Sequence, residues 1–143
     1  MTESQITRRI MARLKEFGGV LFKHADRFTA GVPDLSLTVH NRTWWFEVKL
    51  IDLPPHATTL PMNPRQFPAL QLEFMRQLEG HSTDRAKYLI VIVYGGRVAR
   101  LWVAEPTTVK AILDTGQGAP FVDQIDKFDE AFIRLERPLK GGS

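Results

Sequence analysis

The hydrophobic residues near the N-terminus recur every three or four positions, which is typical of an amphipathic helix. The positions are Ile6, Ile10, Met11, Leu14 and Phe17. Thr2 is suited to cap this helix, and the pair Gly18-Gly19 is suited to end it. A short strand is expected directly afterwards, at residues 20–23.

Residues 34–50 have the alternating pattern of a β-hairpin. Hydrophobic and polar residues alternate from Asp34 to His40, and residues 43–50 are rich in aromatic and β-branched side chains. We place the turn at Asn41-Arg42. Because alternate residues of a strand share a face, Glu47 and Lys49 should project together. The core residues expected on the opposite face are Trp44, Phe46 and Val48.

The rest of the chain contains further helix and strand patterns. Prolines cluster between residues 51 and 68, so we predict a long irregular loop at 51–64. A helix should follow, beginning at Asn63 or Phe67 and ending at Gly80. An unbroken apolar run at 87–94 predicts a strand buried on both faces, turned by two glycines into another strand at 97–103. The apolar face predicted for the helix comprises Leu70, Phe74, Met75 and Leu78.

The C-terminal part gives weaker signals. A short helix is expected at 107–113 and a loop at 116–120, whereas residues 121–135 have a mixed pattern that predicts no particular element. The last residues, 140–143, are expected to fray.

Composition narrows the class of protein. The chain has 143 residues, 43% of them hydrophobic and 24% charged, which suits one soluble globular domain. The formal charge of +3 permits a nucleic-acid partner without indicating one. The absence of cysteine excludes disulfides, thiolate zinc sites and cysteine nucleophiles. We see neither a secretory signal nor a membrane span, so we expect a cytoplasmic protein.

The candidate chemistry lies in the predicted hairpin. Asp34 follows a Gly-Val-Pro turn at the mouth of the first strand, and the second strand returns Glu47 and Lys49 to its side. Two neighbouring carboxylates repel each other, and a hard divalent cation such as Mg²⁺ or Mn²⁺ neutralises them. Such a cation activates a bound water for attack on a phosphodiester, and a lysine can orient that water. The pattern therefore points to phosphodiester hydrolysis.

The segments Gly31-Val32-Pro33-Asp34-Leu35 and Glu47-Val48-Lys49, with twelve residues between Asp34 and Glu47, resemble the core motif of the PD-(D/E)XK nuclease superfamily. The resemblance is closest to the VRR-NUC group, and then to Holliday-junction resolvases. It covers roughly residues 2–93. It implies an α/β fold with a restriction-endonuclease-like core, in which helices flank a mixed central sheet in the order α-β-β-β-α-β.

The resemblance also implies roles for individual residues. Asp34 and Glu47 would bind the metal together with the Val48 carbonyl, Lys49 would assist the water, and Glu3 on the first helix would be a further ligand. A glutamine after the catalytic strand is common in these families. Gln66 is our candidate for that catalytic glutamine, and Gln71 is the alternative. The chain would be a single VRR-NUC-like domain over residues 1–143, with an unassigned C-terminal extension from about residue 104.

The expected function is that of a Mg²⁺-dependent endonuclease, with Mn²⁺ as a substitute, cutting DNA at structured or branched sites such as junctions and flaps. The alternative is a non-catalytic nucleic-acid-binding module of the same fold. The resemblance implies a homodimer, since one active site cuts one strand, and a process such as repair, recombination or phage DNA processing in bacterial cytoplasm.

Several other residues have two explanations. Side chains near Asp34 could contact phosphates or be solvated, namely Lys23, His24, Arg27 and Arg42. Trp44 and Trp45 could stack on bases, but packing in the core explains Trp44 better.

Overall fold

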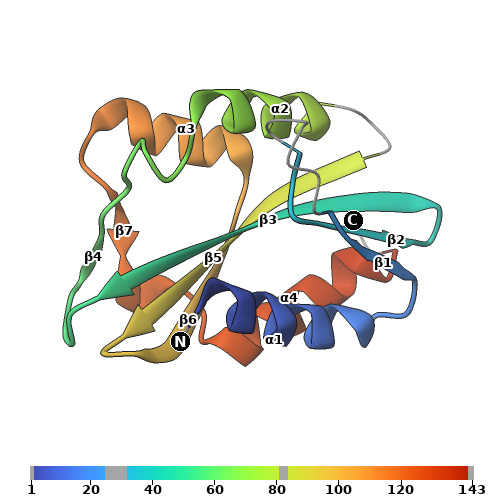
Figure 1. The fold of residues 1–143 in the computed structure, drawn as a ribbon, viewed down its shortest axis with the longest axis horizontal. Helices are drawn as coiled ribbons and strands as arrows, with labels where there is room; N and C mark the ends of the chain where they lie inside the picture. The colour runs from blue at the N-terminus through green and yellow to red at the C-terminus, as the bar shows by residue number, and fades with distance from the viewer. Residues whose placement is uncertain (1, 25–31, 81–83, 142–143) are drawn as a thin grey trace.

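The computed structural model describes residues 2–24, 32–80 and 84–141. A five-stranded mixed sheet forms the centre, with two helices on each face (Figure 1). The strand order is β1-β2-β3-β5-β6. These strands span Val20–Lys23, Leu35–Val39, Arg42–Leu53, Asp84–Tyr94 and Arg97–Ala104. The predicted α/β class with a mixed sheet flanked by helices is confirmed.

Helix α1 spans Glu3–Lys15 and begins as its sequence predicts. The Thr2 hydroxyl accepts a hydrogen bond from the Gln5 N–H at 3.2 Å, and the Gln5 side chain accepts one from the Thr2 N–H at 2.8 Å. This reciprocal pair satisfies two N–H groups that the first turn leaves without helical partners. The helix buries Ile6, Ile10 and Leu14 against the sheet.

The hairpin of β2 and β3 is present, but its turn lies one residue earlier than predicted. Residue Val39 pairs with Arg42, so the turn residues are His40 and Asn41, with φ of 52° and 61°. Positive φ at both central residues suits a two-residue turn between twisted strands, and asparagine tolerates it better than arginine. Arg42 therefore belongs to the strand.

The proline-rich segment is more ordered than predicted. Strand β3 continues to Leu53 because it pairs in parallel with β5 along its whole second half. Strand β4 (Thr59–Leu60) lies in the loop predicted at 51–64 and pairs with β7 (Ala119–Phe121), which begins in the loop predicted at 116–120. A partner more than 50 residues away along the chain supplies these hydrogen bonds, so local sequence could not reveal them.

Helix α2 spans Ala69–Glu79, and Pro68 occupies its N-cap position. Its buried residues are Leu72 and Met75, whereas Leu70 is 62% exposed. The prediction of Leu70 on the apolar face is therefore wrong. At about 100° per residue, Leu70 lies about 200° around the helix from Leu72, so it is on the side away from β5.

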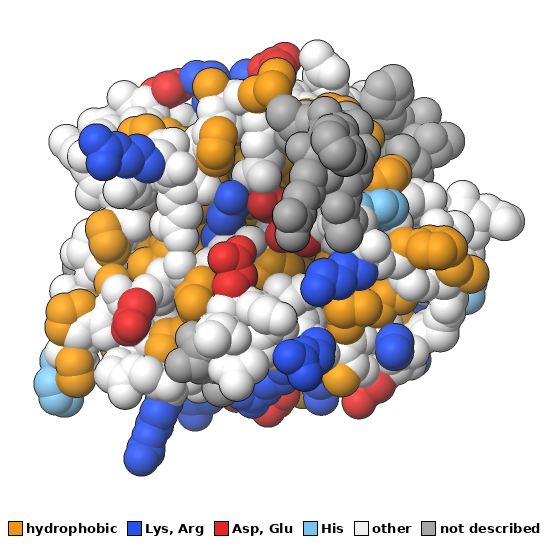
Figure 2. All heavy atoms as spheres, in the orientation of Figure 1, with side chains coloured by type: hydrophobic (Ala, Val, Ile, Leu, Met, Phe, Trp, Pro, Cys, Tyr) orange, Lys and Arg blue, Asp and Glu red, His pale blue; other side chains and the backbone are white. Residues whose placement is uncertain are grey.

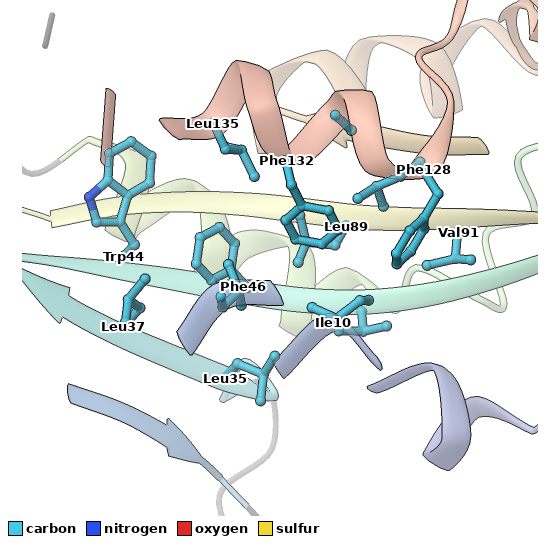
Figure 3. Packing of buried hydrophobic residues seen from close by; sticks show 14 of the residues in the cluster. Ile10, Leu35, Leu37, Trp44, Phe46, Leu89, Val91, Phe128, Phe132 and Leu135 are labelled. Atoms are coloured by element: carbon cyan, nitrogen blue, oxygen red, sulfur yellow. The ribbon is translucent and has the colours of Figure 1, made fainter. Parts of the chain in front are cut away.

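The segment after residue 104 contributes to the hydrophobic cores on both faces of the sheet. Helix α3 (Pro106–Thr115) lies beside α2, and the 3-10 turn Val122–Gln124 precedes α4 (Phe128–Leu139). Figure 3 shows Phe128, Phe132 and Leu135 of α4 against sheet residues of the α1 side. Val109, Val122 and Ile125 are buried on the α2 side. Among the described residues, no helix is long and apolar enough to span a bilayer.

Candidate active site

Pairing of β2 with β3 brings Asp34 and Glu47 together. Leu35 pairs with Phe46, so Asp34, the residue before β2, lies across from Glu47. The Asp34 N–H donates to Glu47 Oε1 at 3.0 Å, and the Val48 N–H donates to Asp34 Oδ2 at 3.0 Å. Each carboxylate is thus held by the backbone of the opposite strand. The predicted proximity of the two acids is confirmed.

The second oxygen of Glu47 has two further donors. Lys49 Nζ lies 3.2 Å from Glu47 Oε2, and Gln71 Nε2 of helix α2 donates to the same atom at 2.6 Å. Because α2 packs over this part of the sheet, Glu47 is only 4% exposed. Figure 2 shows acidic and basic side chains close together near the middle of the view, where β3 passes in Figure 1.

Negative charge is unfavourable at Glu47. The pKa of the Glu47 carboxyl is raised from 4.5 to about 7, mainly by burial and then by the charge of Asp34, while Lys49 opposes both effects. Desolvation disfavours the ionised form of any buried acid, and a like charge adds to that cost. A cation placed between Asp34 and Glu47 would offset the cost of burying the charge and the repulsion between the two carboxylates.

Two buried polar atoms near Glu47 have no hydrogen-bond partner among the described residues. They are the Tyr88 hydroxyl and Gln71 Oε1. Tyr88 pairs with Glu47 across β5 and β3, and burial, followed by the Glu47 charge, raises the pKa of its hydroxyl. The Phe67 ring lies beside these groups. Its centroid is 5.4 Å from the Tyr88 ring centroid and 5.8 Å from Lys49 Nζ. Buried polar atoms without protein partners are where ordered water or an ion is expected.

The donor set fits a hard cation. Two carboxylates on neighbouring strands provide oxygen ligands, the Val48 carbonyl is a third candidate, and Mg²⁺ keeps several waters of its own. Within the described part of the chain, no three His, Cys, Asp or Glu side chains group closely enough to hold a metal by themselves. A metal here would therefore rely on backbone and water for the rest of its shell.

The structure places the two glutamine candidates differently. Gln66 Nε2 donates to the Leu50 carbonyl at 2.5 Å, which ties the turn before α2 to β3. Gln71 is the glutamine that reaches the Glu47 carboxylate. In the sequence both lie shortly after β3, but Gln71 lies within α2 and reaches Glu47, whereas Gln66 precedes the first residue of α2, Ala69.

Glu3 is the first residue of α1 and is exposed. Its backbone carbonyl accepts from the Thr7 hydroxyl, and no hydrogen bond or ion pair among the described residues joins its side chain to Asp34 or Glu47. Its role as a metal ligand stays a prediction.

His24 lies closer to the site than its loop position suggested. Its N–H donates to the Asp34 carbonyl at 2.7 Å, and its Nε2 lies 2.7 Å from the Ser36 hydroxyl. Its ring stacks on Trp45, with centroids 5.3 Å apart. By register, Lys23 and Arg42 face the α1 side of the sheet, away from Glu47. Arg27 lies outside the described residues.

Comparisons with known proteins identify no family for this chain, since no protein-family model matches it and no curated protein sequence matches it.

Proposed function

We propose that the protein is a metal-dependent endonuclease of the PD-(D/E)XK type that hydrolyses DNA phosphodiester bonds. The observation that carries the proposal is the arrangement of Asp34, Glu47 and Lys49. Two carboxylates face each other across β2 and β3, and an ammonium group lies 3.2 Å from the more buried one. A charge arrangement built in this way suits a divalent cation and an anionic substrate.

Asp34 and Glu47 would hold Mg²⁺ or Mn²⁺. When bound there, the cation lowers the pKa of a coordinated water and neutralises charge on the scissile phosphate. Lys49 has three donors on a side chain that is 12% exposed. It can orient the attacking water while stabilising the charge that develops on the phosphate oxygens.

Helix α2 contributes positioning. Gln71 fixes one oxygen of Glu47, and the Asp34 N–H fixes the other. A carboxylate held at both oxygens keeps one rotamer and loses little entropy when it takes up a ligand. Gln71 is therefore a positioning residue in this proposal.

The test is a cleavage panel with Mg²⁺ or Mn²⁺ on linear, flapped and four-way-junction DNA. Lys49→Ala should lower the rate by about 10²-fold or more. Lys87→Ala is a matched control, because Lys87 also lies on a central strand and pairs with a carboxylate, Glu105, at 3.1 Å. Lys87→Ala should cleave at the wild-type rate. If the wild-type protein leaves every substrate intact with both metals, the nuclease proposal fails.

A second candidate is a nucleic-acid-binding module without catalysis. Both Glu47 oxygens already have protein donors, which a purely structural buried ion pair also requires. DNA binding in EDTA, combined with no cleavage after either metal is added, would favour this candidate.

The finer features of the proposal come from the resemblance. We propose branched or flapped DNA as the preferred substrate, a homodimer as the state that cuts both strands, and bacterial cytoplasm as the location. Sedimentation analysis with and without junction DNA tests the dimer directly.

A further inference from the structure

The sheet face that carries Glu47 continues past α2 onto β2 and the edge strand β1. Phe22 of β1 pairs with Ser36 of β2, which pairs with Trp45 of β3. Residues paired across strands project to the same face. Phe22 and Trp45 therefore share the face of Glu47, whereas Leu21 points into the core on the α1 side.

This outer half of the face carries exposed hydrophobic side chains. Phe22 is 60% exposed and Val20 is 54% exposed. Helices α2 and α3 pack on β5, and no helix in the described part of the chain packs on this side of β1 or β2 (Figure 1). An exposed aromatic ring on a strand, beside a candidate active site, is a feature that folding alone does not require.

Three rings lead from the edge of the sheet toward the carboxylates. His24 follows Phe22 by two residues, and its ring stacks on Trp45 with an interplanar angle of 29°. Trp45 lies two residues before Glu47 on β3, about 7 Å along the strand. Phe22 is two strands away from Trp45, about 10 Å across the sheet. We call Phe22, His24 and Trp45 the aromatic platform.

We propose that the aromatic platform binds unpaired bases of a DNA strand whose backbone passes Asp34, Glu47 and Lys49. Aromatic rings stack on any base, so they favour single-stranded nucleic acid with little sequence preference. Bases inside a duplex are already stacked on their neighbours and present only their edges. The platform would therefore select strands that are single, frayed or displaced at a branch. This inference rests on the proposed function for the position of the phosphodiester.

A second copy of this chain is the alternative occupant of the aromatic platform. The segment before α4 covers the outer side of β6, where the Leu101 N–H donates to the Asp126 carbonyl at 3.0 Å. β1 is the other outer strand of the sheet. A second copy of the chain could pair with β1 and cover Phe22. We favour DNA because the platform leads toward the Lys49 ammonium group, which the proposed function places beside a phosphate, and the experiment separates the two occupants.

The experiment measures anisotropy of a labelled oligothymidylate and of a labelled blunt duplex, in EDTA so that nothing is cleaved. Phe22→Ala should weaken oligothymidylate binding about tenfold, which corresponds to about 1.4 kcal/mol and lies within the range for one stacked base. Duplex binding should be unchanged, and Phe22→Tyr should restore the affinity. Ile133→Ala is the matched control, since Ile133 on α4 is 63% exposed and should leave both affinities at wild-type values.

Three results would overturn the inference. Equal affinities of Phe22→Ala and Ile133→Ala for oligothymidylate would remove Phe22 from the interface. An equal loss on duplex DNA would remove the preference for unpaired bases. A wild-type dimer that Phe22→Ala converts to monomers would assign the surface to a second copy. Since binding is measured without metal, a protein that binds through Phe22 but never cleaves would refute only the nuclease proposal.

Discussion

Replacement of Glu47 by glutamine gives a sharp test of the electrostatics of the site, because it removes the titration while keeping the shape. The pKa of Glu47 rises from 4.5 to about 7 on folding, mainly through burial. Between these two pH values the folded protein holds a proton that the unfolded chain has released. Its stability therefore falls by about 1.4 kcal/mol for each pH unit.

The stabilising contribution of protonated Glu47 is complete below pH 4.5 and is lost as the pH rises through about 7. The total loss is about 3 kcal/mol, a large part of the net stability of a small domain. Glu47→Gln is neutral at every pH and lacks this loss. Gln71 can rotate its amide so that Oε1, which has no partner among the described residues, accepts from the new side chain.

The assay is urea unfolding followed by circular dichroism in EDTA, at intervals from pH 4.5 to 8.5. The free energy of unfolding of the wild-type protein should fall by about 3 kcal/mol more than that of Glu47→Gln over this range. Titration of groups that do not interact with Glu47 cancels in this difference. Glu73→Gln, an exposed change on α2, should follow the wild-type curve. Parallel curves for wild type and Glu47→Gln would refute the reasoning.

Three further predictions concern the metal, the glutamine and the C-terminal helix. Mg²⁺ at about 100 times its Kd should stabilise the wild-type protein by about 2.7 kcal/mol in thermal unfolding. This gain should be lost in Asp34→Asn and retained in Asp52→Asn, which alters an exposed carboxylate of β3; equal shifts would place the metal elsewhere. Gln71→Ala should lower stability by about 2 kcal/mol at pH 8, where Glu47 is ionised, and by less at pH 5. Gln77→Ala on the exposed side of α2 should have no effect at either pH, and identical losses at both pH values would contradict a charge-assisted bond. Phe132→Ala should cost about 3–5 kcal/mol, measured by urea unfolding, whereas exposed Ile133→Ala should stay within about 0.5 kcal/mol. A small loss for Phe132→Ala would mean that α4 is not part of the core.

Local pattern predicted most of the secondary structure because most elements here are locally consistent. The spacing of Ile6, Ile10 and Leu14 and the cap at Thr2 place α1 without reference to the rest of the chain. The unbroken apolar run of β5 is buried on both faces, as such runs are. These elements can therefore be predicted without knowing which elements they pack against.

The errors occurred where a distant partner decides the outcome. β3 extends to Leu53 because β5 supplies its hydrogen bonds, and β4 exists because β7 lies beside it. Leu70 is exposed because α2 packs on β5 through the face that carries Leu72 and Met75, and Leu70 lies about 200° around the helix from Leu72. None of these effects can be predicted from the sequence of the short segments concerned.

The candidate site was likewise predictable from the sequence only in part. Strand geometry alone placed Glu47 and Lys49 on one face and Asp34 beside them, and the ion pair and hydrogen bonds agree. The contact of Gln71 with Glu47 depends on how α2 crosses the sheet, and the neighbourhood of Tyr88 depends on the parallel register of β3 with β5. A periodic pattern carries neither piece of information.

The depth of Glu47 changes how the pattern of β3 is interpreted. In a hairpin, a Glu-x-Lys sequence on the polar face is usually solvated, and a surface ion pair of this kind contributes little to stability. Here α2 covers that face, so ionised Glu47 costs about 3 kcal/mol at neutral pH even with Lys49 and Gln71 beside it. An apolar residue in its place would remove that cost. Stability therefore does not explain a carboxylate at this position. A cation shared with Asp34 would explain it, because its charge would cancel the repulsion from Asp34 and stabilise the ionised form against the cost of burial.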